Sequence, residues 1–130
     1  MPKKHLYTIL FISWMMFVTF FSLYSFERDD LSSFNILYGD KLVHFVFYFV
    51  AATPGFLFFH EQKKKRTLFI IQLMLVVVFL VCFGIIIEVV QERFTVNRSG
   101  DVLDVLANSM GAICGVMVMY FRFYSQRWLK

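Results

Sequence analysis

Long apolar stretches alternate with short polar segments along the whole chain. Four stretches, 6–26, 42–59, 68–90 and 102–121, contain only His44, Glu88 and Asp104 besides uncharged residues. Each is close to the roughly 20 residues that a helix needs to cross a hydrocarbon core of about 30 Å. Backbone polar groups find no partner in lipid, so each stretch should be an α-helix. The pattern predicts an all-α polytopic membrane protein, a bundle of four transmembrane helices at about 6–26, 42–59, 68–91 and 102–123, in one domain over 1–130.

Composition and pattern exclude several other classes of protein. Hydrophobic residues make up 59% of the 130 positions, above the roughly 45–50% of a soluble domain. Transmembrane strands would be about half as long and would alternate apolar with polar residues. The first stretch follows Lys3 and Lys4, as in a secretory signal, but it is longer than a signal's apolar region and no cleavage motif follows it. We interpret it as a retained first helix.

The positions of lysine and arginine predict an orientation. Nine of the 13 basic residues lie beside the two termini or in the Lys63–Arg66 run between the second and third helices, and four lie on the other side. The positive-inside rule therefore predicts that both termini are cytoplasmic. Eight of the nine acidic residues then fall on the outer half. The net charge of +4 indicates orientation rather than binding of nucleic acid.

Polar residues enter three of the four helices at this outer level. Asp40 and His44 are four residues apart and Glu88 and Gln91 three apart, so each pair shares a helix face. The full set is Asp40, Lys41 and His44 in the second helix, Glu88, Gln91 and Glu92 in the third, and Arg98, Asp101, Asp104 and Asn108 at the fourth. A charged group facing lipid costs about 2.5–3.5 kcal/mol. We expect these side chains to face one another in a shared polar pocket that opens to the outer surface.

These residue types suggest roles within the pocket. In a catalytic site, Glu88 or Asp104 would act as acid or base with His44 as its partner. The ligand-binding candidates are Asp40, Lys41, Gln91, Arg98, Asp101 and Asn108, with Arg98 or Lys41 facing an anion. The residue types alone do not separate catalysis from binding.

Several of these positions also have a structural explanation, although Glu88 is the hardest to explain in this way. Asp101 is suited to cap the fourth helix, and Asp104 would compensate the dipole of its first turn. Asn108 would join helices by hydrogen bonds, and Gly111 and Gly115 form a G-x-x-x-G pattern that is typical of close helix packing.

Familiar signatures of cofactor and metal chemistry are absent. There is no glycine-rich phosphate loop, no G-x-S-x-G and no H-E-x-x-H, so we assign no cofactor. A metal held by His44 with Glu88, Asp101 and Asp104 stays open, with a hard cation fitting best. Their spacing is not diagnostic, and zinc usually takes more than one histidine or cysteine. We therefore assign no metal site from the sequence.

The spacing of the polar residues resembles that of the VanZ-like family of bacterial membrane proteins. The matching motifs are Asp40-Lys41-x-x-His44-x-x-x-Tyr48, Glu88-x-x-Gln91 and Arg98-x-x-Asp101-x-x-Asp104-x-x-x-Asn108-x-x-Gly111-x-x-x-Gly115. The last of these is the most specific. The resemblance implies a multi-pass protein of the bacterial cytoplasmic (inner) membrane, in a family whose namesake is linked to teicoplanin resistance.

Two functions fit these observations, and a third fits less well. The chain would bind or modify a cell-envelope lipid or a lipid-linked envelope precursor, with an effect on glycopeptide susceptibility. The alternative is a non-enzymatic structural or interaction protein whose polar cluster only holds the helices in register. A transporter is least favoured because the cytoplasmic halves of the helices are almost free of polar residues. Between Leu68 and Ile87, the third helix offers only Gln72. Membrane lipid is the expected partner, and no oligomeric state is indicated.

Overall fold

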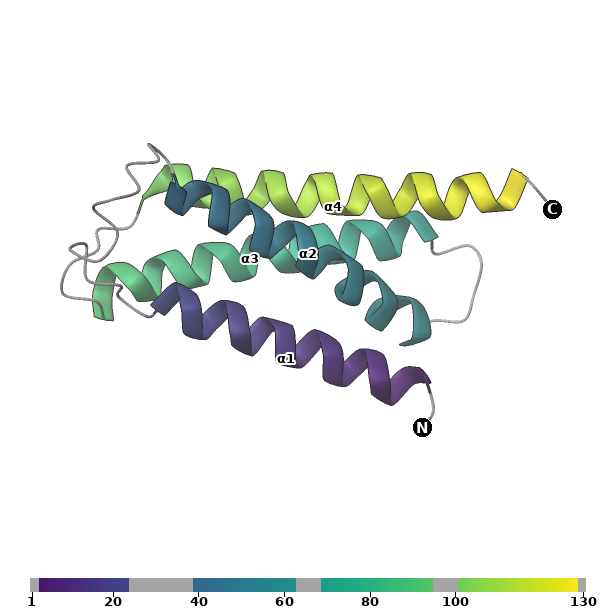
Figure 1. Ribbon diagram of the computed structural model, residues 1–130, viewed down its shortest axis with the longest axis horizontal. Coiled ribbons are helices and arrows are strands. Elements are labelled where there is room, and N and C mark those ends of the chain that lie inside the picture. Colours follow the sequence, from purple (N-terminus) through teal and green to yellow (C-terminus); the bar gives the residue numbers. More distant parts are fainter. Residues whose placement is uncertain (1–2, 24–38, 63–68, 95–100, 129–130) are drawn as a thin grey trace.

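Four α-helices make up the described part of the chain. The computed structural model describes residues 3–23, 39–62, 69–94 and 101–128. Its helices are α1 (Lys3–Leu23), α2 (Gly39–Gln62), α3 (Phe69–Phe94) and α4 (Val102–Trp128), and these segments contain no strand (Figure 1). All four are long and apolar enough to cross a membrane. The predicted all-α fold with four transmembrane helices is confirmed.

Several helices extend beyond the apolar stretches from which they were predicted. α2 begins at Gly39 and so includes Asp40 and Lys41, while α4 continues to Trp128, past the predicted end at residue 123. α3 ends at Phe94, and α1 begins at Lys3. An apolar stretch marks the length that suits lipid, whereas backbone hydrogen bonding continues through polar residues with ordinary helix propensity.

Successive helices run in opposite directions, which brings three polar helix ends together. Both termini lie at one end of the bundle, and the starts of α2 and α4 lie at the other end with the end of α3 (Figure 1). α2 and α4 share the most extensive interface; α1 packs mainly on α2 and less on α3. The second end, where α2 and α4 start, is called the polar end below.

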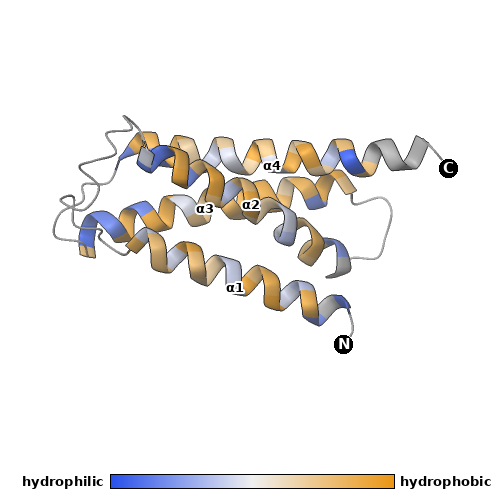
Figure 2. Ribbon diagram, viewed as in Figure 1, coloured by the Kyte–Doolittle hydropathy of each residue, from blue (hydrophilic) through white to orange (hydrophobic). Residues whose placement is uncertain are grey.

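The outer surface of the bundle is apolar, as a lipid solvent requires. Large side chains such as Met16, Ile70 and Met74 point outward and are more than 60% exposed. The interior is also largely apolar, with Phe56 and Leu80 fully buried. Hydrophilic residues gather toward the ends of the helices (Figure 2). Polar side chains buried between the helices are therefore the features that need explanation.

Two glycines set the distance between α2 and α4. A Cβ atom at Gly111 would overlap the backbone carbonyl oxygen of Phe45, and a Cβ at Gly115 would lie 2.5 Å from the carbonyl oxygen of Phe49. The α2 backbone thus rests directly on these positions of α4. This close contact places the polar residues of both helices within hydrogen-bonding distance at the polar end.

Candidate functional site

The polar end contains a group of buried polar side chains drawn from α2, α3 and α4. Five of the predicted residues are 5% exposed or less: His44, Glu88, Gln91, Asp104 and Asn108. They are distant in sequence and come together only because the three helix ends meet. Buried polar groups in an apolar bundle are costly unless they find partners, so their contacts define the site.

Lys41 joins α2 to the start of α4. Its Nζ donates hydrogen bonds to Asp101 Oδ2 at 2.7 Å and to Asp104 Oδ1 at 3.0 Å, and it also contacts Asp40 Oδ2 at 3.3 Å. Asp104 is buried, whereas the side chains of Asp40 and Asp101 are 47% and 39% exposed. One ammonium group therefore faces three carboxylates.

Asp101 caps α4 and also belongs to the cluster. Its Oδ1 accepts a hydrogen bond from the backbone N–H of Leu103 at 2.9 Å, which satisfies a free donor of the first turn. Its own backbone N–H points to Glu88 Oε2 at 3.4 Å. The hydrogen bond from Lys41, followed by that from the Leu103 N–H, lowers the pKa of Asp101 below its ordinary value of 3.8. The carboxylate therefore stays charged at neutral pH.

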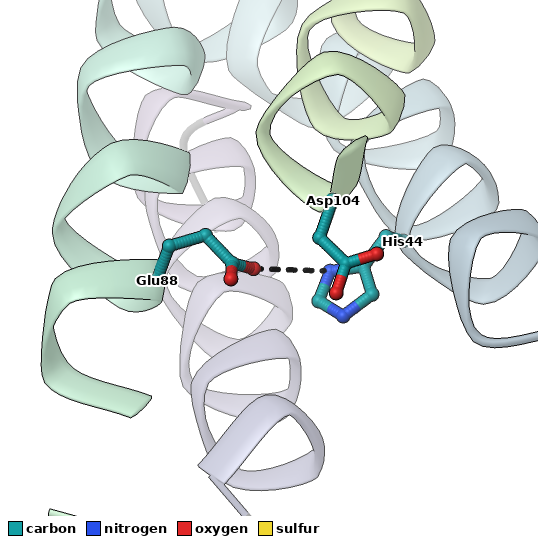
Figure 3. A group of neighbouring side chains, drawn as sticks. All are labelled: His44, Glu88 and Asp104. Atoms are coloured by element: carbon teal, nitrogen blue, oxygen red, sulfur yellow. Dashed lines mark ion pairs between the residues drawn. The ribbon is translucent and has the colours of Figure 1, made fainter. Parts of the chain in front are cut away.

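His44, Glu88 and Asp104 form the deeper part of the site. His44 Nδ1 lies 3.1 Å from Asn108 Oδ1 and 4.0 Å from Glu88 Oε1. The three side chains point toward one another from three different helices (Figure 3). Each offers one nitrogen or oxygen atom, and these atoms all lie within 4.8 Å of one another. This arrangement is able to share a proton or to hold a metal ion.

Gln91 ties α1 to the site. Its Nε2 donates a short hydrogen bond to the backbone carbonyl oxygen of Ser22, near the end of α1. Gln91 is 2% exposed. The first helix, which carries no charged residue of the cluster, is therefore anchored at the same membrane level.

Comparison with known proteins identifies the family. A model of the family described as VanZ/LLP1 matches residues 7–124 of the chain. The chain belongs to the VanZ/LLP1 family. Neither the curated proteins nor the solved structures contained a match to it. The predicted VanZ-like identity is thus confirmed, and the matched region includes every residue of the polar cluster.

Two predicted site residues of this VanZ/LLP1 chain are not part of the cluster as described. Glu92 lies one turn beyond Glu88 on α3 but is exposed. Arg98 lies outside the described residues, as does the Lys63–Arg66 run. Of the two basic candidates, Lys41 and Arg98, Lys41 is the one that the described part of the chain places among the carboxylates.

Sequence reasoning missed two residues that line the VanZ/LLP1 site. The sequence motif includes Tyr48 but gives it no role in the pocket, and Gly84 is not among the candidates. A Cβ at Gly84 would lie 3.2 Å from Asn108 Nδ2 and 3.4 Å from Tyr48 Cε1. Both side chains therefore pack against Gly84, one helical turn before Glu88. The signal was the position of Gly84 at i−4 from Glu88, on the same face of α3.

A separate polar contact lies toward the opposite end of the VanZ/LLP1 bundle. His60 Nδ1 is 3.0 Å from Gln72 Oε1, and Gln72 is 1% exposed. Between this contact and the polar end lie buried apolar residues, including Ala52, Val76 and Leu80. The two polar regions are thus separated by an apolar layer, which does not favour a continuous transport path.

Proposed function

We propose that this VanZ/LLP1 protein binds the head group of a cell-envelope lipid, or of a lipid-linked envelope precursor, at the polar end. The supporting observation is the burial of His44, Glu88, Asp104 and Asn108 at one level of an otherwise apolar bundle. Intramembrane ionisable residues are expensive and are retained chiefly for function. The excess of basic residues on the side of the termini favours an orientation in which the polar end faces outward from the cytoplasmic membrane.

An apolar groove between α1 and α3 offers a place for the acyl chain of the same lipid. The groove has a volume of about 660 Å³ and extends from mid-helix toward the polar end. Its lining residues are Phe11, Ile12, Met15, Met16, Thr19, Phe20, Leu23, Phe79 and Phe83. Leu23 adjoins Ser22, whose carbonyl oxygen accepts the hydrogen bond from Gln91. A lipid whose chain occupied the groove would therefore bring its head group to the level of the cluster.

The charge of the cluster restricts the head group. Among the described residues, the ammonium group of Lys41 faces the carboxylates of Asp40, Asp101 and Asp104, and a fourth carboxylate, that of Glu88, accepts from the backbone N–H of Asp101. Such a site favours amino groups and hydroxyl-rich groups, which donate hydrogen bonds to carboxylates. Amino-bearing or sugar-bearing head groups are the expected class.

Retention of lipid by the purified protein tests the proposal. The native chain, Glu88→Gln and Glu92→Gln would be purified in detergent from the same host, and bound lipids would be counted by mass spectrometry. Glu92→Gln is the matched control, because it removes the same charge from an exposed position of the same helix. We expect retention in the native chain and the control, with at least a tenfold loss in Glu88→Gln. Equal retention in all three would refute the proposal.

A susceptibility assay tests the link to the cell envelope. The native chain and a Glu88→Gln/Asp104→Asn variant would be expressed at equal levels in a teicoplanin-sensitive Gram-positive host. A higher inhibitory concentration with the native chain, lost in the variant, would connect the cluster to glycopeptide susceptibility. No change with a correctly inserted native chain would remove that role in the host tested.

A structural role is the second candidate, and one observation favours it. The contacts of Lys41 with Asp101 and Asp104, and of His44 with Asn108, all join α2 to α4. In this case Glu88→Gln, which leaves these contacts intact, would not alter lipid retention. Variants that break the contacts would lower thermal stability and abundance in the membrane.

A further inference from the structure

The deepest part of the polar cluster has the composition of a metal site. His44 on α2, Glu88 on α3 and Asp104 on α4 are all buried, and their potential ligand atoms lie within 4.8 Å of one another (Figure 3). We propose that these three side chains bind one divalent metal ion with mixed nitrogen and oxygen preference, such as Zn²⁺ or Mn²⁺. The inference does not depend on the lipid proposed above, because metal binding is measurable without lipid.

The distances are compatible with closure around an ion. Metal–ligand bonds to histidine nitrogen and carboxylate oxygen are about 2.0–2.2 Å long, so two ligands of one ion lie at most about 4.4 Å apart. His44 Nδ1 and Glu88 Oε1 are 4.0 Å apart, and a metal bound to Nδ1 would replace the contact of this nitrogen with Asn108 Oδ1. Bringing all three atoms onto an ion requires movements on the order of 1 Å, which side-chain rotations supply without moving the helices.

The electrostatics favour a dication. With His44 neutral, the carboxylates of Asp40, Glu88, Asp101 and Asp104 exceed the one ammonium group of Lys41 by three formal negative charges among the described residues of the cluster. Glu88 and Asp104 contribute two of the four, and their side chains are 7% and 8% exposed. Carboxylates at that depth are costly unless positive charge lies beside them. A bound divalent cation would neutralise most of the excess.

The donor set indicates the kind of metal. One imidazole and two carboxylates suit Zn²⁺, Mn²⁺ or Fe²⁺, whereas soft ions such as Cu⁺ prefer sulfur. Cys82 and Cys114 are free thiols outside this group. Three protein ligands leave at least one coordination position for water or for a bound molecule, as in catalytic rather than structural zinc sites.

Two further buried groups support a ligand at this position. Asn108 Nδ2 and Tyr48 Oη are buried and have no hydrogen-bond partner among the described residues. Both side chains pack against Gly84, one turn from Glu88, while the other amide atom of Asn108 contacts His44. Both groups are hydrogen-bond donors, and buried donors are normally satisfied. A water or hydroxide held by the metal would supply an acceptor for them.

Equilibrium dialysis of the full chain tests the proposal. The protein would be purified in detergent with a tag that contains no histidine, stripped with chelator, and dialysed against Zn²⁺ or Mn²⁺ in the absence of added lipid. We expect one ion per chain. Glu88→Gln, Asp104→Asn and His44→Gln should each weaken binding at least tenfold. His60→Gln, at the opposite end of the bundle, and the exposed Glu92→Gln should bind like the native chain.

A thermal readout separates loss of the site from loss of the fold. The metal should raise the Tm of the native chain and of His60→Gln but not that of Glu88→Gln, whose Tm without metal reports its folding. If His44→Gln fails to fold, the two carboxylate variants still decide the matter. Absence of binding of either ion by folded native protein, or binding that survives both carboxylate changes, would overturn the inference. Lipid retention by a chain that binds no metal would leave the proposed function standing alone.

Discussion

Replacement of Gly111 by alanine tests how the α2–α4 contact positions the site. The new Cβ would overlap the Phe45 carbonyl oxygen and would lie 3.0 Å from the Phe45 carbonyl carbon and 3.1 Å from its Cα. All three are backbone atoms of α2, so no side-chain rotation relieves the overlap. The two helices must separate.

The size of the effect follows from these distances. Non-bonded carbons normally lie about 3.5–4.0 Å apart, so α2 must move by roughly 0.5–1 Å. The Lys41–Asp104 and His44–Asn108 contacts, at 3.0 and 3.1 Å, would then exceed ordinary hydrogen-bond lengths. Overpacking costs about 1–3 kcal/mol, and alanine's higher helix propensity offsets up to about 1 kcal/mol, so we expect a net loss of about 1–2 kcal/mol.

Thermal denaturation in detergent, followed by size-exclusion chromatography of the surviving protein, measures this loss. Gly55→Ala is the matched control, since a Cβ there meets the side chains of Phe11 at 3.1 Å and Val76 at 3.4 Å, and both can adjust. We expect the Tm to fall by several degrees in Gly111→Ala and to stay within about a degree of native in Gly55→Ala. A Gly111→Ala Tm equal to that of the control would refute the reasoning.

Three further predictions concern the polar end. Lys41→Met leaves the buried Asp104 carboxylate without its ammonium partner, so we expect the free energy of unfolding to fall by about 3–5 kcal/mol. The double variant with Asp104→Asn should recover part of the lost Tm, and no recovery would contradict the pairing. Tyr48→Phe removes a buried hydroxyl that has no partner among the described residues, so the Tm should be unchanged or higher, and a clear fall would reveal a partner. The pKa of Asp101 is lower in the folded state than its ordinary value of 3.8. The carboxylate therefore stabilises the fold above pH 3.8, and this contribution is lost as the pH falls through the folded-state pKa. A Tm series between pH 5 and 2.5, as test conditions, should therefore show a smaller acid-induced fall in Asp101→Asn than in the native chain.

The fold was predictable because its signal is repeated and local. Four apolar stretches are long enough to span a membrane, and in lipid their backbone polar groups must be satisfied within each stretch. An α-helix does this. The helix ends were less predictable. Asp40 and Lys41 lie inside α2, although the predicted membrane span began only at residue 42, because helix propensity continues where hydrophobicity stops.

Most residues of the site could be predicted from the sequence, but the contacts between their side chains could not. Helical spacing placed Asp40 with His44 and Glu88 with Gln91 on shared faces, and antiparallel neighbours carried these faces to one level. It did not show that Lys41 binds the acids of α4 while His44 faces Glu88. Those choices depend on rotation of each helix about its axis, which no local pattern specifies.

The sequence by itself determined the number of spans, their helical character and which residues avoid lipid, since each follows from the cost of placing a polar group in hydrocarbon. The tertiary structure decided which polar groups meet. The backbone of α2 rests on Gly111 and Gly115, and this contact sets the separation that puts Lys41 on Asp104. The meeting of α3 with the other two helices brings Glu88 to His44 and Asp104. A chemical site emerges only there, because distances of a few ångströms between three helices are set by packing and not by spacing along the chain.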